Sequence, residues 1–277
     1  MFLSVQIAAN VQALRNATAS FLNTVCRGCI ATGIIHSKQS ASALFSVADE
    51  LVRTVHRACD QAEGAARDAA FQIARGKIDQ LMAFSVAEAE WCEKKGRDEA
   101  NEYCEQLINF LRVTFGNVDN FKMAEKEGFC FGCAGHIATR IMGMVINGAG
   151  AFTDVPQDTE ITSIEKINGF GIQNLSLDVA AFQSFADGCD VPQLSLCFNE
   201  LKCFTDALGD RELVRLCEEA NSDERMAKYP MLDLLKLRAV LEKYVGAGMS
   251  LLGGKQEFFL LEKKHIAKLL NSIKTQI

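Results

Sequence analysis

The chain has 277 residues, 49% of them hydrophobic, and its 29 basic and 35 acidic side chains give a net charge of −6. A chain of this length can bury a sizeable core in one large or two modest domains, and its acidic balance argues against nucleic acid as a partner. The sequence has 11 cysteines, and its first residues, Met1-Phe2-Leu3, lack the basic region of a secretory leader. We therefore expect reduced thiols and a cytoplasmic protein.

The three prolines, at positions 156, 192 and 230, leave the first 155 residues without a helix breaker. Strict alternation of apolar and polar residues, which is typical of strands, is scarce. We therefore predict an all-α fold, an elongated rod of stacked helical bundles. The polar, turn-like stretch around Pro156 predicts two helical-bundle subdomains, 1–150 and 151–277, that meet near residues 148–161.

Apolar residues at three- and four-residue spacing predict one helix over residues 3–29 and a longer one over 42–96. The first seam consists of Ile7, Val11, Leu14, Thr18, Phe21 and Val25. The second is rich in alanine, which lets neighbouring backbones approach closely. Trp91, the only tryptophan, is expected to close the second segment against the helix that follows.

The segment 97–118 shows a wide amphipathic pattern, with Tyr103, Leu107, Phe110 and Leu111 on one stripe. A stripe this wide has to be covered from more than one side. We therefore place this helix at the centre of the stack and expect Leu107, Phe110 and Leu111 to be buried.

The remaining pattern predicts a further series of helices. A helix over 129–147 contains the most apolar window of the chain, which glycines, His136 and Arg140 interrupt too often for a membrane span. The capping-box sequence 162–165 predicts a short helix that Gly169 and Gly171 end. Helices are then expected over 175–186, 192–208, 211–220, 232–245 and 258–277, with a charged loop over 221–227.

Two CxxC pairs, Cys26/Cys29 and Cys130/Cys133, are the strongest chemical motifs. Such pairs can build a zinc or redox site, but about a hundred residues separate them and both lie in helical periodicity. Packing cysteines are the favoured interpretation, and an autonomous helical protein with a cysteine-based zinc or redox site is the alternative. No catalytic constellation is visible, so we expect neither enzyme activity nor a cofactor or metal.

Several short sequence words occur in the order in which they stand in one known family. They are EG…KID within 63–79, LINFLR at 107–112, HIATRIM at 136–142, LDV…FA within 177–186, FNELK at 198–202 followed by Asp206, and KY at 228–229. In these words and their order, about residues 5–230 resemble the C-terminal helical region of the exocyst subunit that acts as a Rab-GTPase effector.

The resemblance implies a module for vesicle tethering in exocytosis. It would bind a Rab-family GTPase in its GTP form and other exocyst subunits, reach vesicle and plasma membranes through these partners, and bind neither nucleic acid nor a small-molecule substrate. The family places its GTPase-binding face in the C-terminal subdomain.

The segment 193–216 is where we place that face. Leu196, Leu201, Phe204 and Leu208 are expected to face the core. A mixed apolar and charged strip would then turn outward and contact the GTPase, with apolar burial supporting affinity and charges setting register. The strip consists of Phe198, Lys202, Thr205, Asp206, Arg211 and Glu212.

Overall fold

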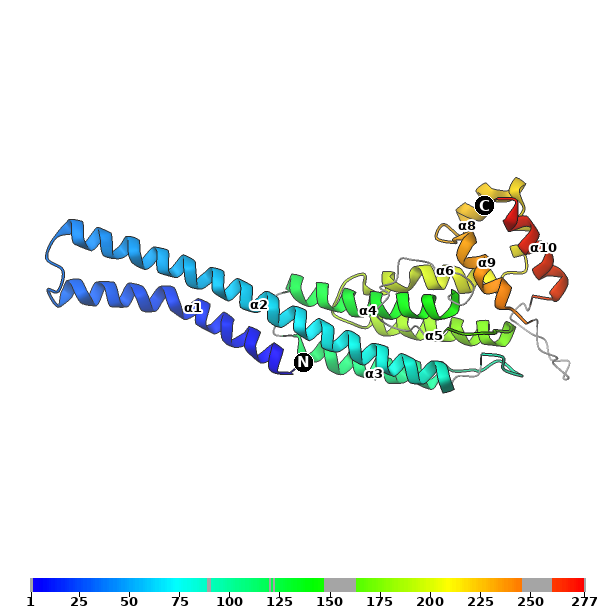
Figure 1. Cartoon of the computed structure of the whole chain (residues 1–277), viewed down its shortest axis with the longest axis horizontal. Helices are drawn as coiled ribbons and strands as arrows, with labels where there is room; N and C mark the ends of the chain where they lie inside the picture. Colours follow the sequence, from blue (N-terminus) through cyan, green and yellow to red (C-terminus); the bar gives the residue numbers. More distant parts are fainter. Residues whose placement is uncertain are drawn as a thin grey trace. The chain divides into compact units, whose positions relative to one another are not determined.

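The computed structural model describes residues 2–88, 91–119, 121, 123–146, 163–245 and 261–276. Helices dominate these ranges (Figure 1), which confirms the predicted all-α fold. The α-helices are α1 (Phe2–Ala31), α2 (Lys38–Glu88), α3 (Glu102–Asn117), α4 (Met123–Ile146), α5 (Gly169–Asp187), α6 (Asn199–Leu208), α7 (Leu213–Leu216), α8 (Ser222–Lys228), α9 (Leu234–Lys243) and α10 (Lys263–Lys274). Two 3-10 turns, η1 (Leu194–Phe198) and η2 (Glu219–Asn221), precede α6 and α8.

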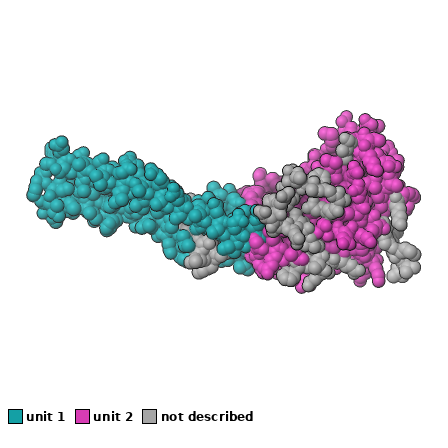
Figure 2. Space-filling view, in the orientation of Figure 1, with its two compact units in different colours: residues 1–75, 113–129 teal, residues 76–112, 130–277 magenta. Residues whose placement is uncertain are grey.

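The chain forms two compact units, which Figure 2 colours separately. Unit 1 comprises residues 1–75 and 113–129, and unit 2 comprises residues 76–112 and 130–277. Helices α2, α3 and α4 each contribute residues to both units. The boundary expected near 148–161 lies outside the described residues, so the division into 1–150 and 151–277 stays a prediction.

Unit 1 is built on the hairpin of α1 and α2, which run side by side (Figure 1). Arg15 of α1 forms ion pairs with Asp60 and Glu63 of α2. Small buried side chains such as Cys26 and Cys59 occupy the seam and permit a close approach of the two helices. The start of α4 joins this unit through Phe129, whose ring meets that of Phe71 edge-on at 6.2 Å between centroids.

The core of unit 2 includes the first part of α3 and most of α4. Leu107 and Leu111 are completely buried, as predicted, whereas Phe110 is only half-buried, so its predicted full burial is wrong. Helix α4 is long and apolar enough to cross a membrane by length and composition alone. Since 72% of its most apolar window is buried in the fold, it is accounted for as a core helix.

The start of α5 differs from the prediction. Residues 163–168 are not helical, because the backbone amides of Ile164 and Ile167 donate instead to the carbonyls of Met144 and Lys243, at 3.0 and 3.2 Å. The glycines expected to end a helix stand at the beginning of one. The Asn168 side chain caps it by accepting from the Gly171 amide at 2.9 Å.

Three polar side chains near the N-terminal half of α5 hold the segment 91–101, which connects α2 to α3. Asn168 donates to the carbonyl of Glu93 at 2.6 Å, and Asn174 accepts from the amide of Arg97 at 3.0 Å. Asp178 accepts from the amide of Asn101, one turn further along, at 2.7 Å. Asn174 and Asp178 are four residues apart and therefore lie on one side of the helix. We call these two residues, together with the capping Asn168, the polar face of α5.

Asp178 is the most heavily used residue of the polar face. Besides the amide of Asn101, its carboxylate accepts the Asn101 side-chain amide at 2.7 Å and the Tyr103 hydroxyl at 2.6 Å, and it has no exposed surface. Burial raises the pKa of Asp178, and the three hydrogen bonds oppose that effect. Buried carboxylates persist only when their oxygens are satisfied in this way.

A partly buried polar cluster joins α2 to α4 in unit 2. Oδ1 of Asp79 lies 2.8 Å from Nε2 of His136 and 2.7 Å from Nε of Arg140. His136 and Arg140 are four residues apart, so both project from one side of α4. The polar residues that interrupt the apolar window of α4 therefore have a structural role.

We expect Asp178→Ala to lower the free energy of unfolding by about 3–5 kcal/mol, because it leaves two amide groups and a hydroxyl without an acceptor in the interior. Asp187→Ala, at an exposed position of the same helix, should change it by about 0.5 kcal/mol or less. Chemical denaturation followed by circular dichroism measures both. Equal, small effects would show that the segment 91–101 does not depend on Asp178.

Candidate functional site

The strip predicted to contact a GTPase lies on η1, α6 and the residues that precede α7. Two members of the strip point inward. Phe198 is 0% exposed and stacks on Phe182 of α5, with ring centroids 5.2 Å apart and planes at 8°. Thr205 is also buried, and its hydroxyl donates to the carbonyl of Lys202 at 3.1 Å. The predicted outward orientation of Phe198 and Thr205 is therefore wrong.

Helical spacing explains this error. Phe198 stands three residues before Leu201, so at about 100° per residue the two lie about 60° apart on one side of the helix, whereas Leu196 lies about 140° from Leu201. Leu196 of η1 is accordingly 52% exposed, and its expected place in the core is wrong. After the turn the expected core positions Leu201, Phe204 and Leu208 are buried as predicted.

The other four predicted residues, Lys202, Asp206, Arg211 and Glu212, are exposed. Lys202 and Asp206 form an ion pair of 2.7 Å one turn apart on α6. Exposed pairs of this kind contribute only about 0.3–0.5 kcal/mol to stability, since water screens them and two long side chains lose freedom. These charges therefore remain available to a partner at little cost to the fold.

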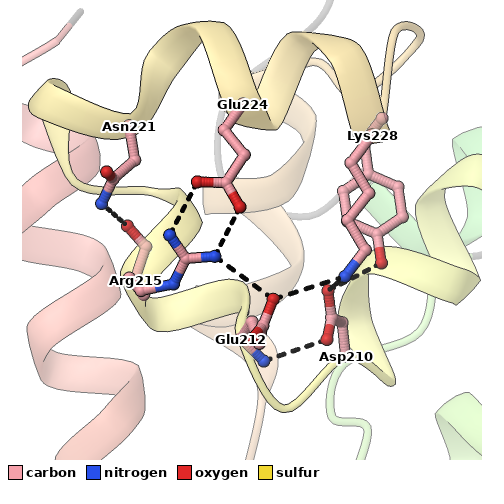
Figure 3. Close-up of polar contacts among 7 residues, drawn as sticks. Asp210, Glu212, Arg215, Asn221, Glu224 and Lys228 are labelled. Atoms are coloured by element: carbon pink, nitrogen blue, oxygen red, sulfur yellow. Dashed lines mark hydrogen bonds and ion pairs between the residues drawn. The ribbon is translucent and has the colours of Figure 1, made fainter.

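A larger ionic network continues from Glu212 across α7 and α8 (Figure 3). Both terminal nitrogens of Arg215 contact the carboxylate of Glu224, at 2.6 and 2.7 Å, and one of them also contacts Glu212 at 3.2 Å. The hydrogen bond from Arg215 lowers the pKa of Glu224, although the group lies at the surface. This two-point geometry fixes α8 relative to α7 more closely than a single lysine contact would.

Asp210 connects the network to α6. Its carboxylate accepts from Lys228 and from the Tyr229 hydroxyl, both at 2.8 Å, and from the amide of Glu212 at 3.0 Å. Partial burial acts to raise the pKa of Asp210, but the three donors outweigh it and the pKa is lowered. Asp210 thus holds the segment that presents Arg211 and Glu212.

The sequence pattern did not single out Asp210, Arg215 or Glu224. Only Lys228 and Tyr229 had a signal, as the KY pair of the family resemblance, and the structure shows that both contact Asp210. The predicted charged loop 221–227 is wrong, because residues 222–228 form α8. The charges of this segment predicted a loop because the sequence does not show that Glu224 pairs with Arg215, nine residues before it.

A cavity of about 300 Å³ borders the other side of α6. One wall is the small-residue face of α4 that includes Gly135, Thr139 and Gly143, and the opposite wall includes Leu201. Glu200 of α6 and Lys236 of α9 form an ion pair at its rim. Cys197 also lines the cavity, and Leu196, the residue before it, is exposed.

The cysteines show the features of packing residues. All 11 are free thiols, and Cys130 and Cys133 are completely buried. Burial is the main cause that raises the pKa of Cys133 to about 12, and the neighbouring Cys130 adds to it. The Cys133 thiol therefore stays protonated at neutral pH and is a poor ligand and nucleophile. In the described residues no three Cys, His, Asp or Glu side chains are grouped to hold a metal ion. A zinc or redox site is not favoured.

Comparison with known proteins points to one family. A family model described as "Exocyst complex subunit Sec15 C-terminal" matches residues 3–243. A curated protein of Caenorhabditis elegans, "Exocyst complex component 6", is 24% identical over 203 residues, which are 73% of this chain and 23% of the relative. No solved structure matches the chain.

Because the family model covers most of the sequence, the chain belongs to the family of the C-terminal region of the exocyst subunit Sec15. It spans about a quarter of the length of the curated relative that it matches.

Asp210→Ala should lower the free energy of unfolding by about 1–3 kcal/mol, because two donors at the surface and one partly buried hydroxyl lose their acceptor. Asp206→Ala, which removes only an exposed ion pair, should change it by less than about 1 kcal/mol. Urea denaturation compares the two variants. A loss for Asp206→Ala as large as that for Asp210→Ala would contradict the structural role of Asp210.

Proposed function

We propose that this chain is part of an exocyst subunit that binds a Rab-family GTPase in its GTP form and helps to tether secretory vesicles to the plasma membrane. Membership of the Sec15 C-terminal family supports the tethering role. The chain would also contact other exocyst subunits, act in the cytoplasm and reach membranes through these partners. It would work by binding and would catalyse no reaction.

One observation carries the choice of surface. Lys202, Asp206, Arg211 and Glu212 form an exposed charged strip whose backbone is held by buried anchors on one side and by Asp210 on the other. A GTPase switch segment becomes ordered only with the γ-phosphate and its metal ion, so an effector that offers a rigid surface binds that state selectively. Charges that are already positioned raise the rate of encounter and fix the register.

The apolar part of the contact has to come from residues other than Phe198. Leu196 is 52% exposed immediately before α6 and can enter an apolar recess of the GTPase. Interfaces gain most of their affinity from a few anchors that enter such pockets, with charges at the rim. We assign the apolar contact to Leu196, and the register to Lys202, Asp206, Arg211 and Glu212.

A pull-down with a panel of Rab proteins, each in GTP-locked and GDP-locked form, tests the proposed function. We expect at least one member to bind in its GTP-locked form and to bind more weakly in its GDP-locked form. Absence of nucleotide-dependent binding across the panel would contradict the GTPase-effector role and leave the tethering role to contacts with other exocyst subunits.

For the Rab protein identified in that way, Lys202→Glu should weaken binding at least tenfold, about 1.4 kcal/mol, because it reverses a charge that the strip presents to the GTPase. Arg53→Glu, which reverses an exposed arginine on α2, should leave binding unchanged. Calorimetric titration measures both affinities, and melting temperatures should stay near that of the wild type. Full affinity in Lys202→Glu would place the site elsewhere, on α9 or α10. Phe198→Ala is unsuited to this test, because it removes a core ring and should lower stability by about 3–5 kcal/mol.

A further inference from the structure

Unit 1 carries most of the large apolar side chains that are exposed in the described part of the chain, although it is the smaller unit. Five of them lie on α1. Ile30 is 38% exposed and stands apart from the other four, which are Ile7, Leu14, Phe21 and Val25, with exposures of 41%, 56%, 66% and 43%. Exposed apolar groups are common singly, but a run along one helix marks an interaction surface.

The four residues form one stripe. Ile7, Leu14 and Phe21 are seven residues apart and Val25 follows by four, so at about 100° per residue they lie within about 40° around α1. The stripe lies beside the face that packs on α2, to which Arg15 and Cys26 belong, and not opposite to it. A helix with two adjacent apolar faces is typical of a four-helix bundle, where each helix packs against two neighbours.

Charge indicates what covers the stripe. Arg15 and Arg27 are the only charged residues in the sequence of α1, and Arg15 is paired with α2. The neighbouring helix α2 carries many acidic and basic residues. A partner selected by charge would need complementary groups on α1, and the stripe offers none. An uncharged apolar face of heptad spacing fits, without repulsion, a second uncharged face of the same spacing, and the α1 stripe is itself such a face.

We propose that the α1 stripe is a self-association surface, through which two copies of this chain pair to complete a four-helix bundle from two α1–α2 hairpins. The spacing suits a two-fold arrangement with antiparallel α1 helices. Leu14 then meets Leu14 of the second copy on the symmetry axis, and Ile7 meets Phe21 on either side. Such an interface is self-complementary, as two-fold dimers require. It does not depend on the proposed GTPase contact, which lies in unit 2.

Sedimentation equilibrium of the full chain under reducing conditions, at tens of micromolar, tests the proposal. The wild type should show twice the monomer mass of 30.4 kDa. Leu14→Glu should raise the dissociation constant at least tenfold by burying two like charges against each other. Asn16→Glu adds the same charge to the opposite, exposed side of α1 and should leave the dimer intact. Circular dichroism checks that each variant keeps its helical content.

Mixing provides the sharper control. If the two Leu14 side chains meet on the axis, Leu14→Glu and Leu14→Lys should each be monomeric alone and should associate when mixed, because opposite charges then face each other. This result would also show that neither variant had lost its fold. A monomeric wild type, a Leu14→Glu variant that still dimerises, or mixed variants that stay apart while folded would each overturn the proposal.

Discussion

The polar face of α5 is the constraint on which the architecture of unit 2 depends. The segment 91–101 has no helical hydrogen bonds of its own to satisfy its backbone, and three side chains of the α5 region replace them. Asp178 alone binds the amide that precedes α3 and the first buried tyrosine within it. Since an unsatisfied buried amide or hydroxyl costs about 1–3 kcal/mol, this face fixes where α3 begins and how it lies on α5.

The same side of α5, one turn further along, supports the candidate surface. Phe182, one turn after Asp178, stacks on Phe198, which ends η1 immediately before α6. The charged strip on α6 therefore stands on a buried aromatic pair and not on a flexible loop. Asp210 holds the other end of the strip, since it binds α8 through Lys228 and the turn before α7 through the Glu212 amide. A rigid display of weakly paired charges would suit the GTPase contact that we propose.

The three- and four-residue spacing of apolar residues predicted the long helices. The helices α1, α2 and α4 and the buried Leu107 and Leu111 follow from it. The seam predicted on α1 is wrong at Ile7, Leu14, Phe21 and Val25, which are exposed, because the face that packs on α2 includes Arg15 and Cys26 instead. The same spacing placed the start of α3 five residues too early, at 97 instead of 102, because the amides of Arg97 and Asn101 bond to side chains of α5. Helix propensity, which depends on local sequence, cannot predict that a distant side chain will accept a backbone hydrogen bond.

Two further differences have the same origin in tertiary contact. Gly171 reads as a helix breaker, but it lies inside α5 because any Cβ there would overlap the carbonyl oxygen of Trp91. Phe198 was expected at the surface, but its ring packs on Phe182 of α5 in the core. The family resemblance led us to the strip on 193–216, but two of its six predicted members, Phe198 and Thr205, are core residues. Short sequence motifs indicated the family, whereas the three-dimensional contacts were needed to tell the exposed residues of the strip from the buried ones.

Hydrogen exchange at single amides, measured by NMR, tests the role of the polar face of α5 most directly. The amides of Arg97 and Asn101 lie outside any helix, and each donates to a side chain of α5. Our account predicts that both exchange as slowly as the core amides of α3, at rates set by cooperative opening of unit 2. Exchange at the unprotected rate of an open loop would contradict it, because the segment would then be ordered by something other than Asn174 and Asp178.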